Sequence, residues 1–161
     1  MFLLKCIRML TLSLGLAVFG LGASLAFSGA AHAGTKPAVF TEILQPAAVG
    51  GYDLTSYFAG APVRGSAQFA ATHNGATYWF ANAANRTRFQ ANPNAFLPQY
   101  GGYCAWAVAQ NKTAPGRPQF WRVVDGKLYL NYDQGVQTRW NRDIPGFITR
   151  ANANWPRVLT R

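Results

Sequence analysis

The sequence predicts an α+β domain, in which a small antiparallel sheet built from two hairpins packs with several short helices. The first observation is a pair of turn dipeptides, Asn74-Gly75 and Asp125-Gly126, each between segments rich in β-branched and aromatic residues. The second is a series of short segments outside the hairpins, several of which follow an Asp or Asn that can cap a helix. Hairpins mixed with short helices are typical of the α+β class.

Residues 1–33 have the pattern of a secretory signal peptide. A short basic start precedes an uncharged, largely apolar run over residues 9–27, and Ala31 and Ala33 supply the small residues that a signal peptidase reads. A membrane anchor is the alternative, because the run approaches the ~20 residues that a spanning helix needs, although its glycines weaken it. We therefore predict a cleaved signal and export to the periplasm.

Residues 34–48 are expected to form an irregular lead-in, and residues 49–161 to form one domain. After cleavage the chain would keep a single cysteine, Cys104, and a single histidine, His73. One cysteine cannot form an internal disulfide, so the fold must rely on its core. The five Trp and seven Tyr of the chain all follow the predicted signal and can supply that core.

The first half of the domain begins at residues 50–58, where Asp53 is placed to cap a short turn of helix. A hairpin is predicted over residues 68–80, around the Asn-Gly turn. Asn82 then caps a predicted helix that ends near Pro93.

The second half begins with a Gly101-Gly102 kink, after which residues 104–110 are predicted to be helical. A second hairpin covers residues 120–132. Asp133 caps the next predicted helix, and Asp143 starts a final helix that reaches Trp155. The pattern indicates no internal repeat, no low-complexity tract and no second domain.

Residues 73–104 resemble a YHS domain. The matching positions are Asn74-Gly75, Tyr78, Phe80, Phe89, Pro93 and the aromatic position between Phe96 and Tyr100. The opening segment GYDLTSYF, residues 51–58, is similar to the opening of the exported, stand-alone branch of that family. The resemblance spans residues 49–156.

The resemblance implies a metal-binding domain, since YHS domains are suspected metal binders. The cysteines that metal-binding members carry at the strand-to-helix step are replaced here by Ala81 and Asn85. Copper and zinc sites need three or four soft or imidazole ligands, so a closed structural site is excluded. An open copper or zinc site is left, with Cys104, His73 and Asp53 as candidate ligands. The candidate lining residues are Tyr52, Tyr57, Tyr78 and Tyr103.

Cys104 is the residue on which the functional prediction depends. The exported branch resembles this chain at GGYC, and some of its relatives carry selenocysteine there, so the resemblance implies a chemical role. Cys104 is also expected in the first turn of a helix, where the helix dipole would lower the pKa of the thiol. The alternative is a small apolar side chain that fills the core.

Three functions follow from these alternatives. The first is a metal-binding module with one copper or zinc ion. The second is a thiol redox protein with Cys104 as the catalytic nucleophile; without a second cysteine it would need an external thiol partner. The third is a non-catalytic envelope interaction module in which Cys104 is core packing. Whether the protein is an enzyme, and its oligomeric state, are left open.

The chain is strongly basic, with 15 Lys and Arg against 5 Asp and Glu and a net charge of +10. An exported protein rarely meets DNA, and the basic residues form no adjacent run, so no nucleic-acid partner is expected. Loose contact with the anionic surface of the cell envelope is the milder prediction.

Overall fold

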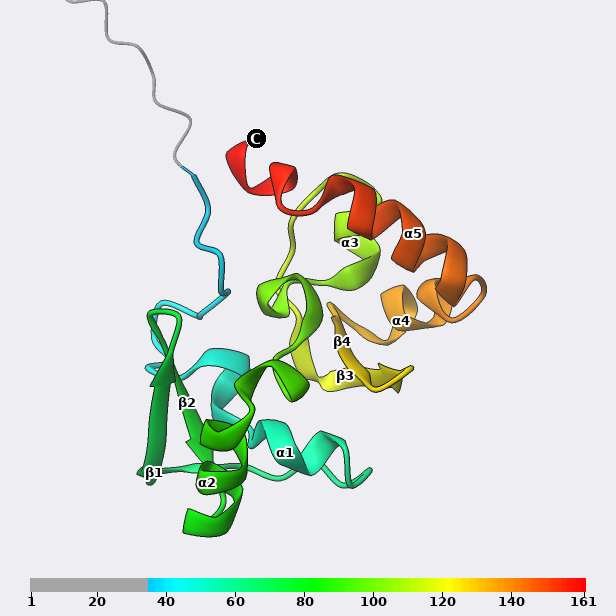
Figure 1. Cartoon of the computed structure of the whole chain (residues 1–161). Coiled ribbons are helices and arrows are strands. Elements are labelled where there is room, and N and C mark those ends of the chain that lie inside the picture. Colours follow the sequence, from blue (N-terminus) through cyan, green and yellow to red (C-terminus); the bar gives the residue numbers. More distant parts are fainter. Residues whose placement is uncertain (1–34) are drawn as a thin grey trace, which may run out of the picture. The chain divides into compact units, whose positions relative to one another are not determined.

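The computed structural model describes residues 35–161 (Figure 1). The predicted signal peptide, residues 1–33, lies outside the described residues. Among residues 35–161 there is no helix of the length and apolarity required to cross a membrane. The α+β prediction is confirmed, with one difference. The two hairpins do not join into one sheet, and each forms its own antiparallel two-stranded sheet.

The elements agree with the predicted order. The part of the chain up to residue 92 holds η1 (Ala48–Gly51), α1 (Leu54–Tyr57), β1 (Ser66–His73), β2 (Ala76–Phe80) and α2 (Ala83–Ala91). The rest holds η2 (Pro93–Ala95), η3 (Gln99–Gly102), α3 (Ala105–Ala109), β3 (Arg117–Val124), β4 (Lys127–Asn131), α4 (Gln134–Trp140), α5 (Ile144–Asn154) and η4 (Arg157–Thr160). The predicted caps are confirmed, because the side chains of Asp53, Asn82, Asp133 and Asp143 each accept a backbone N–H of the helix that follows.

The chain contains one structural unit twice, so the prediction that it has no internal repeat is wrong. The copies stand at a constant spacing of 51 residues, as from Tyr52 to Tyr103. We call residues 49–92 the first repeat and residues 100–143 the second repeat. In each, a left-handed turn, a short helix, a hairpin and a capped helix follow one another, namely η1–α1–β1–β2–α2 and η3–α3–β3–β4–α4.

The backbones of the two repeats agree in detail. Val49 and Tyr100, which are equivalent, have φ of 55° and 56°. The hairpin registers also correspond, and both ladders shift over the same stretch, between Ser66 and Ala70 and between Arg117 and Trp121. Equivalent loop hydrogen bonds recur as well, Gly65 N to Gly51 O at 2.8 Å and Gly116 N to Gly102 O at 3.1 Å.

The sequence hides this duplication because only ten of the 44 paired positions hold the same residue, and four of those ten are glycines. Three of the four shared glycines stand at left-handed turns or hairpin turns, where φ is positive, namely Gly50/Gly101, Gly51/Gly102 and Gly75/Gly126. The fourth pair is Gly65/Gly116, where a Cβ would overlap a neighbouring backbone. Core positions differ freely between the repeats, since apolar cores tolerate exchanges of similar volume. A search by hydrophobic pattern therefore finds two hairpins without finding the repeat.

The buried side chains form two groups, one mainly from each repeat, although Leu128 and Leu130 of β4 belong to the first group. The first group contains Tyr57, Tyr78, Phe80 and Phe89, and the second contains Tyr103, Tyr129 and Trp140, among others. Figure 1 shows α1 and α2 beside the β1–β2 hairpin, α3 and α4 beside the β3–β4 hairpin, and α5 packed on α3. The repeats also contact each other, because the Tyr57 hydroxyl donates to Pro118 O at 3.1 Å.

The lead-in is irregular, as predicted, but it is held in place by the second repeat and the C-terminal end. Lys36 N donates to Leu159 O and Phe40 N to Gly101 O, both at 2.8 Å. A Cβ at Gly101 would overlap the carbonyl oxygen of Ala38. The close approach of the lead-in therefore depends on glycine at this position.

Candidate functional site

Asp53 is a buried structural cap in the first repeat. Its carboxylate accepts the N–H and the hydroxyl of Thr55 at 2.9 and 2.8 Å. It also accepts Ala81 N at 2.9 Å and Asn85 Nδ2 at 2.7 Å. Four donors thus satisfy the carboxylate and tie α1 to the step between β2 and α2. The helix-cap role is confirmed, and these contacts occupy the oxygens that a metal ion would need.

Cys104 holds the equivalent position in the second repeat. Its N–H donates to Ala114 O at 2.9 Å, as that of Asp53 donates to Val63 O at 3.0 Å. The residue is the N-cap of α3, so the prediction that it lies within the first turn is off by one position. The side chain is fully buried, and Sγ lies 3.8 Å from Oδ1 of Asn131, to which the thiol donates.

Burial raises the pKa of the Cys104 thiol, and this outweighs the nearby N–H groups of Ala107, Tyr132 and Trp106, which lower it. The sequence-based expectation of a lowered pKa is therefore wrong. Its physical reason was sound, because backbone donors do surround the sulfur. However, α3 is a single short helix. The loss of solvent destabilises the thiolate by more than a few backbone N–H donors stabilise it.

His73 lies at the end of β1, half-buried, with its ring edge-on to Phe89 at a centroid distance of 6.1 Å. Within residues 35–161, no three His, Cys, Asp or Glu side chains are placed to hold one metal ion. The structure therefore does not assemble Cys104, His73 and Asp53 into the predicted ligand set. Copper or zinc binding stays a prediction, now without a ligand cluster behind it.

The four candidate lining tyrosines do not gather around one site. Tyr57 and Tyr78 are buried in the first core group, with Tyr52 packed against it, whereas Tyr103 belongs to the second. The Tyr103 hydroxyl donates to Pro37 O at 2.9 Å, and Arg64 lies over the Tyr52 ring. Three of the four thus have structural contacts that account for them, and Tyr78 differs.

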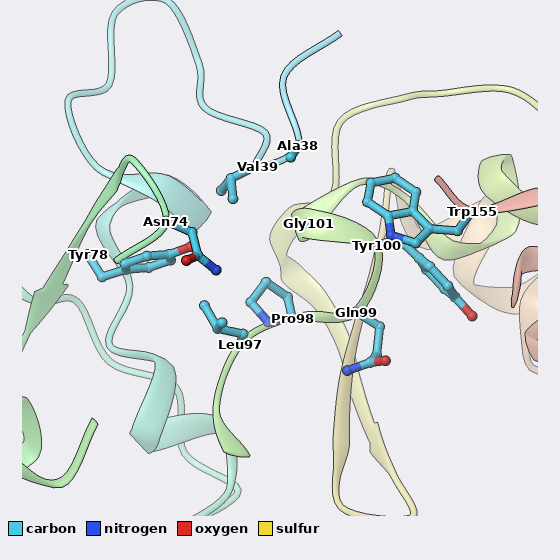
Figure 2. A pocket seen from close by; sticks show the side chains of 10 residues that line it. All are labelled: Ala38, Val39, Asn74, Tyr78, Leu97, Pro98, Gln99, Tyr100, Gly101 and Trp155. Atoms are coloured by element: carbon cyan, nitrogen blue, oxygen red, sulfur yellow. The ribbon is translucent and has the colours of Figure 1, made fainter. Parts of the chain in front are cut away.

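A pocket of about 320 Å³ lies where the two repeats meet, and we call it the junction pocket (Figure 2). In Figure 2, Asn74 and Tyr78 of the first repeat stand on one side and Tyr100 and Trp155 on the other, with Leu97 and Pro98 of the connecting segment between them. None of the lining side chains is charged; they are Ala38, Val39, Asn74, Tyr78, Leu97, Pro98, Gln99, Tyr100, Gly101 and Trp155.

The Tyr78 hydroxyl is an unsatisfied polar group at this pocket. Tyr78 is 1 % exposed, and its hydroxyl oxygen has no hydrogen-bond partner in the described part of the chain. Burial raises the pKa of Tyr78 to about 12, so the phenol keeps its proton at neutral pH and can donate. Buried hydroxyl groups in native proteins are normally paired, and an exception calls for an explanation.

No motif in the sequence points directly to the junction pocket. Asn74 and Tyr78 belong to the predicted hairpin, and Tyr78 is also a candidate lining residue, but of a metal or thiol site at Cys104. The pocket also needs Val39 from the lead-in and Trp155 from beyond α5, which are far apart in the chain. A search for the repeat would have helped, because the segment between two copies is where such a site can form.

The basic side chains are largely unopposed by acids. Asp53, Asp133 and Asp143 cap helices, and the described residues form two ion pairs, Arg117–Glu42 and Arg150–Asp143. Five arginines instead lie over aromatic rings, in the pairs Arg64–Tyr52, Arg88–Phe96, Arg117–Tyr132, Arg139–Trp106 and Arg150–Phe147. The positive charge is thus spread over both repeats.

Comparisons with known protein families, with curated proteins and with solved structures found no match for this chain. The resemblance to YHS domains therefore stays a prediction.

Proposed function

We propose that this protein is a non-catalytic binding module, in which Cys104 is a structural residue and the junction pocket is the binding site. The observation that carries the proposal is the position of Cys104. Its thiol is fully buried at the place where the first repeat has the capping carboxylate of Asp53. A residue that replaces a structural cap at an equivalent position needs no chemical role to explain it.

The burial of the sulfur argues against the two chemical alternatives. A redox thiol must be reached by its oxidant, and the thiolate is the reactive form. Cys104 has no exposed surface, burial raises its pKa, and it donates to Asn131. A metal site would need further ligands beside the sulfur, and none are grouped in residues 35–161.

The proposal is tested by the reactivity of the thiol. In a Cys6→Ser background, Cys104 is the single cysteine, and its reaction with an aromatic disulfide reagent is followed with and without urea. We expect the native thiol to react no faster than the protein unfolds. We also expect no copper or zinc to be retained after dialysis, as measured by native mass.

A reachable thiol in the same protein provides the control. Gln90 is exposed on α2, so Gln90→Cys combined with Cys104→Ser should react fully within the mixing time. Rapid reaction of native Cys104 would overturn the proposal in favour of thiol chemistry. One equivalent of metal that is lost in Cys104→Ser would overturn it in favour of a metal site.

Export and loose contact with an anionic envelope surface form part of this proposal. The excess of basic residues, and the arginines that lie exposed or half-buried over aromatic rings, support the second point. Such contact would be weakened by salt, because exposed charges more than about 10 Å apart are screened at 0.1 M ionic strength.

A further inference from the structure

The junction pocket differs in chemistry from the rest of the molecule. The chain carries a net charge of +10, yet no charged residue lines this pocket. Burying an unpaired charge is costly, and nothing in the lining could compensate one. The pocket therefore favours an uncharged occupant over the anions that the remaining surface attracts.

The size and the walls of the pocket indicate a ring. A dry cavity of about 150 Å³ in a protein core can hold benzene, so a volume of about 320 Å³ has room for one or two rings. The Tyr78 ring on one side and the Trp155 indole on the other line the space together with aliphatic Leu97 and Val39, whereas the Tyr100 ring points away and its hydroxyl donates to Asn152. Offset or edge-on contacts with such rings stabilise a planar aromatic ligand.

Tyr78 supplies the specific contact. Its phenol is buried and unpaired among residues 35–161, and Figure 2 shows its hydroxyl end directed toward the pocket interior, on the same side as the Asn74 amide. The Tyr78 oxygen is closed to solvent in the free protein, so a carbonyl or hydroxyl oxygen of the ligand would accept its O–H after a lining side chain moves aside. The amide of Asn74 offers both a donor and an acceptor. A few placed polar groups in a mostly apolar pocket are typical of small-molecule sites.

We propose that the junction pocket binds an uncharged planar compound of one or two rings that carries a hydrogen-bond acceptor for Tyr78. The inference rests on the proposed function, since it names the ligand class of the same site. The two repeats supply opposite walls, so the ligand would bridge them.

Benzamide is the probe, because it combines a neutral ring with a carbonyl acceptor, and benzoate is its charged analogue. Binding is followed by chemical shifts of the backbone amides of Asn74 and Gly101 and the indole of Trp155. We expect benzamide to shift these three signals with a Kd of about 1 mM or tighter. Benzoate should bind at least tenfold more weakly at these signals, despite the basic surface.

Tyr78→Phe tests the specific contact, and Tyr129→Phe is the matched control at the equivalent position of the second repeat. Removing an unsatisfied buried hydroxyl should leave stability unchanged or raised. The affinity for benzamide should fall about fivefold to tenfold in Tyr78→Phe, since one hydrogen bond is lost. It should not change in Tyr129→Phe.

Three results would overturn the inference: benzoate bound as tightly as benzamide, equal benzamide affinity in Tyr78→Phe and wild type, or no shift at the three signals at several millimolar probe. These results are separable from a failure of the proposed function. An inert Cys104 with an unresponsive pocket removes only the ligand assignment, whereas a reactive native thiol removes the non-catalytic assignment whatever the pocket binds.

Discussion

The two repeats share a backbone but use different side chains to satisfy the same helix end. In the first repeat, Asp53 caps α1 by accepting Thr55 N. In the second, the equivalent donor is Trp106 N, and it donates to Oδ1 of Asn131 at 3.4 Å. The capping acceptor has thus moved from the N-cap residue to the end of strand β4, and Cys104 is left with a hydrogen to donate to the same oxygen.

This exchange has a cost in the core of the second repeat. Phe80 and Phe89 of the first repeat pack with ring centroids 4.9 Å apart, and their equivalents are Asn131 and Trp140. The Nδ2 of Asn131 and the Nε1 of Trp140 are buried, and neither has a partner among the described residues. A thiol at an N-cap can therefore be structural when another side chain supplies the acceptor.

The largest expected effect concerns the two left-handed turns. Gly101→Ala should lower the free energy of unfolding by about 3 kcal/mol, because strain at positive φ adds to an overlap with the Ala38 backbone. Gly50→Ala carries the same strain, but its new Cβ would meet only a side-chain atom, Pro118 Cγ, at 3.0 Å. We therefore expect its free energy of unfolding to fall by only about 1 kcal/mol.

Urea unfolding of both variants measures this difference. Equal falls in the free energy of unfolding in the two variants would contradict this expectation. They would mean that the lead-in moves away from the new methyl group and is not held by the second repeat.

An intermediate effect is expected when the second repeat is given the side chains of the first. Cys104→Asp and Asn131→Phe should each cost about 2 kcal/mol alone, since the first buries a carboxylate beside an amide oxygen and the second removes the acceptor of Trp106 N. Together they restore the pair found at Asp53 and Phe80. The double variant should be more stable than the sum of the single effects predicts, by about 1 kcal/mol or more.

A double-mutant cycle from urea unfolding gives this coupling energy. If the two single variants lower the free energy of unfolding additively, Asn131 does not replace the missing carboxylate. The two helix starts would then be equivalent in position but not in how they are capped.

The smallest effect is expected at alkaline pH. Burial raises the pKa of Tyr78 from 10.0 to about 12, so the folded state holds its proton more tightly than the unfolded chain. The contribution of the protonated Tyr78 to the free energy of unfolding is therefore complete below pH 10 and is lost as the pH rises through about 12. Between neutral pH and pH 11, the free energy of unfolding of Tyr78→Phe should therefore fall by about 1 kcal/mol less than that of wild type.

Unfolding free energies at neutral pH and pH 11 test this expectation. Burial also raises the pKa of the equivalent Tyr129. The fall in the free energy of unfolding between neutral pH and pH 11 should therefore also be smaller in Tyr129→Phe than in wild type. If the free energy of unfolding of Tyr78→Phe fell as much as that of wild type, solvent would reach the phenol, which would contradict the burial of its hydroxyl at the junction pocket.

Short-range residue patterns were enough to predict the local structure of this protein. Asn74-Gly75 and Asp125-Gly126 predicted both hairpins because type I′ turns need positive φ at both positions, and the structure has 49° and 75° in one and 48° and 69° in the other. Asp53, Asn82, Asp133 and Asp143 predicted the helix starts for an equally local reason, since a cap bonds to an N–H two or three residues away.

Tertiary structure decided everything that depends on distant neighbours. Cys104 follows a glycine pair and precedes a helix, which locally favours a thiolate, yet packing removed its solvent and raised its pKa. His73 and Asp53 were candidate ligands by residue type, but the fold placed one against Phe89 and surrounded the other with donors. The junction pocket arises where two copies of one unit meet, because burial and cavities depend on three-dimensional packing and not on the order of residues along the chain.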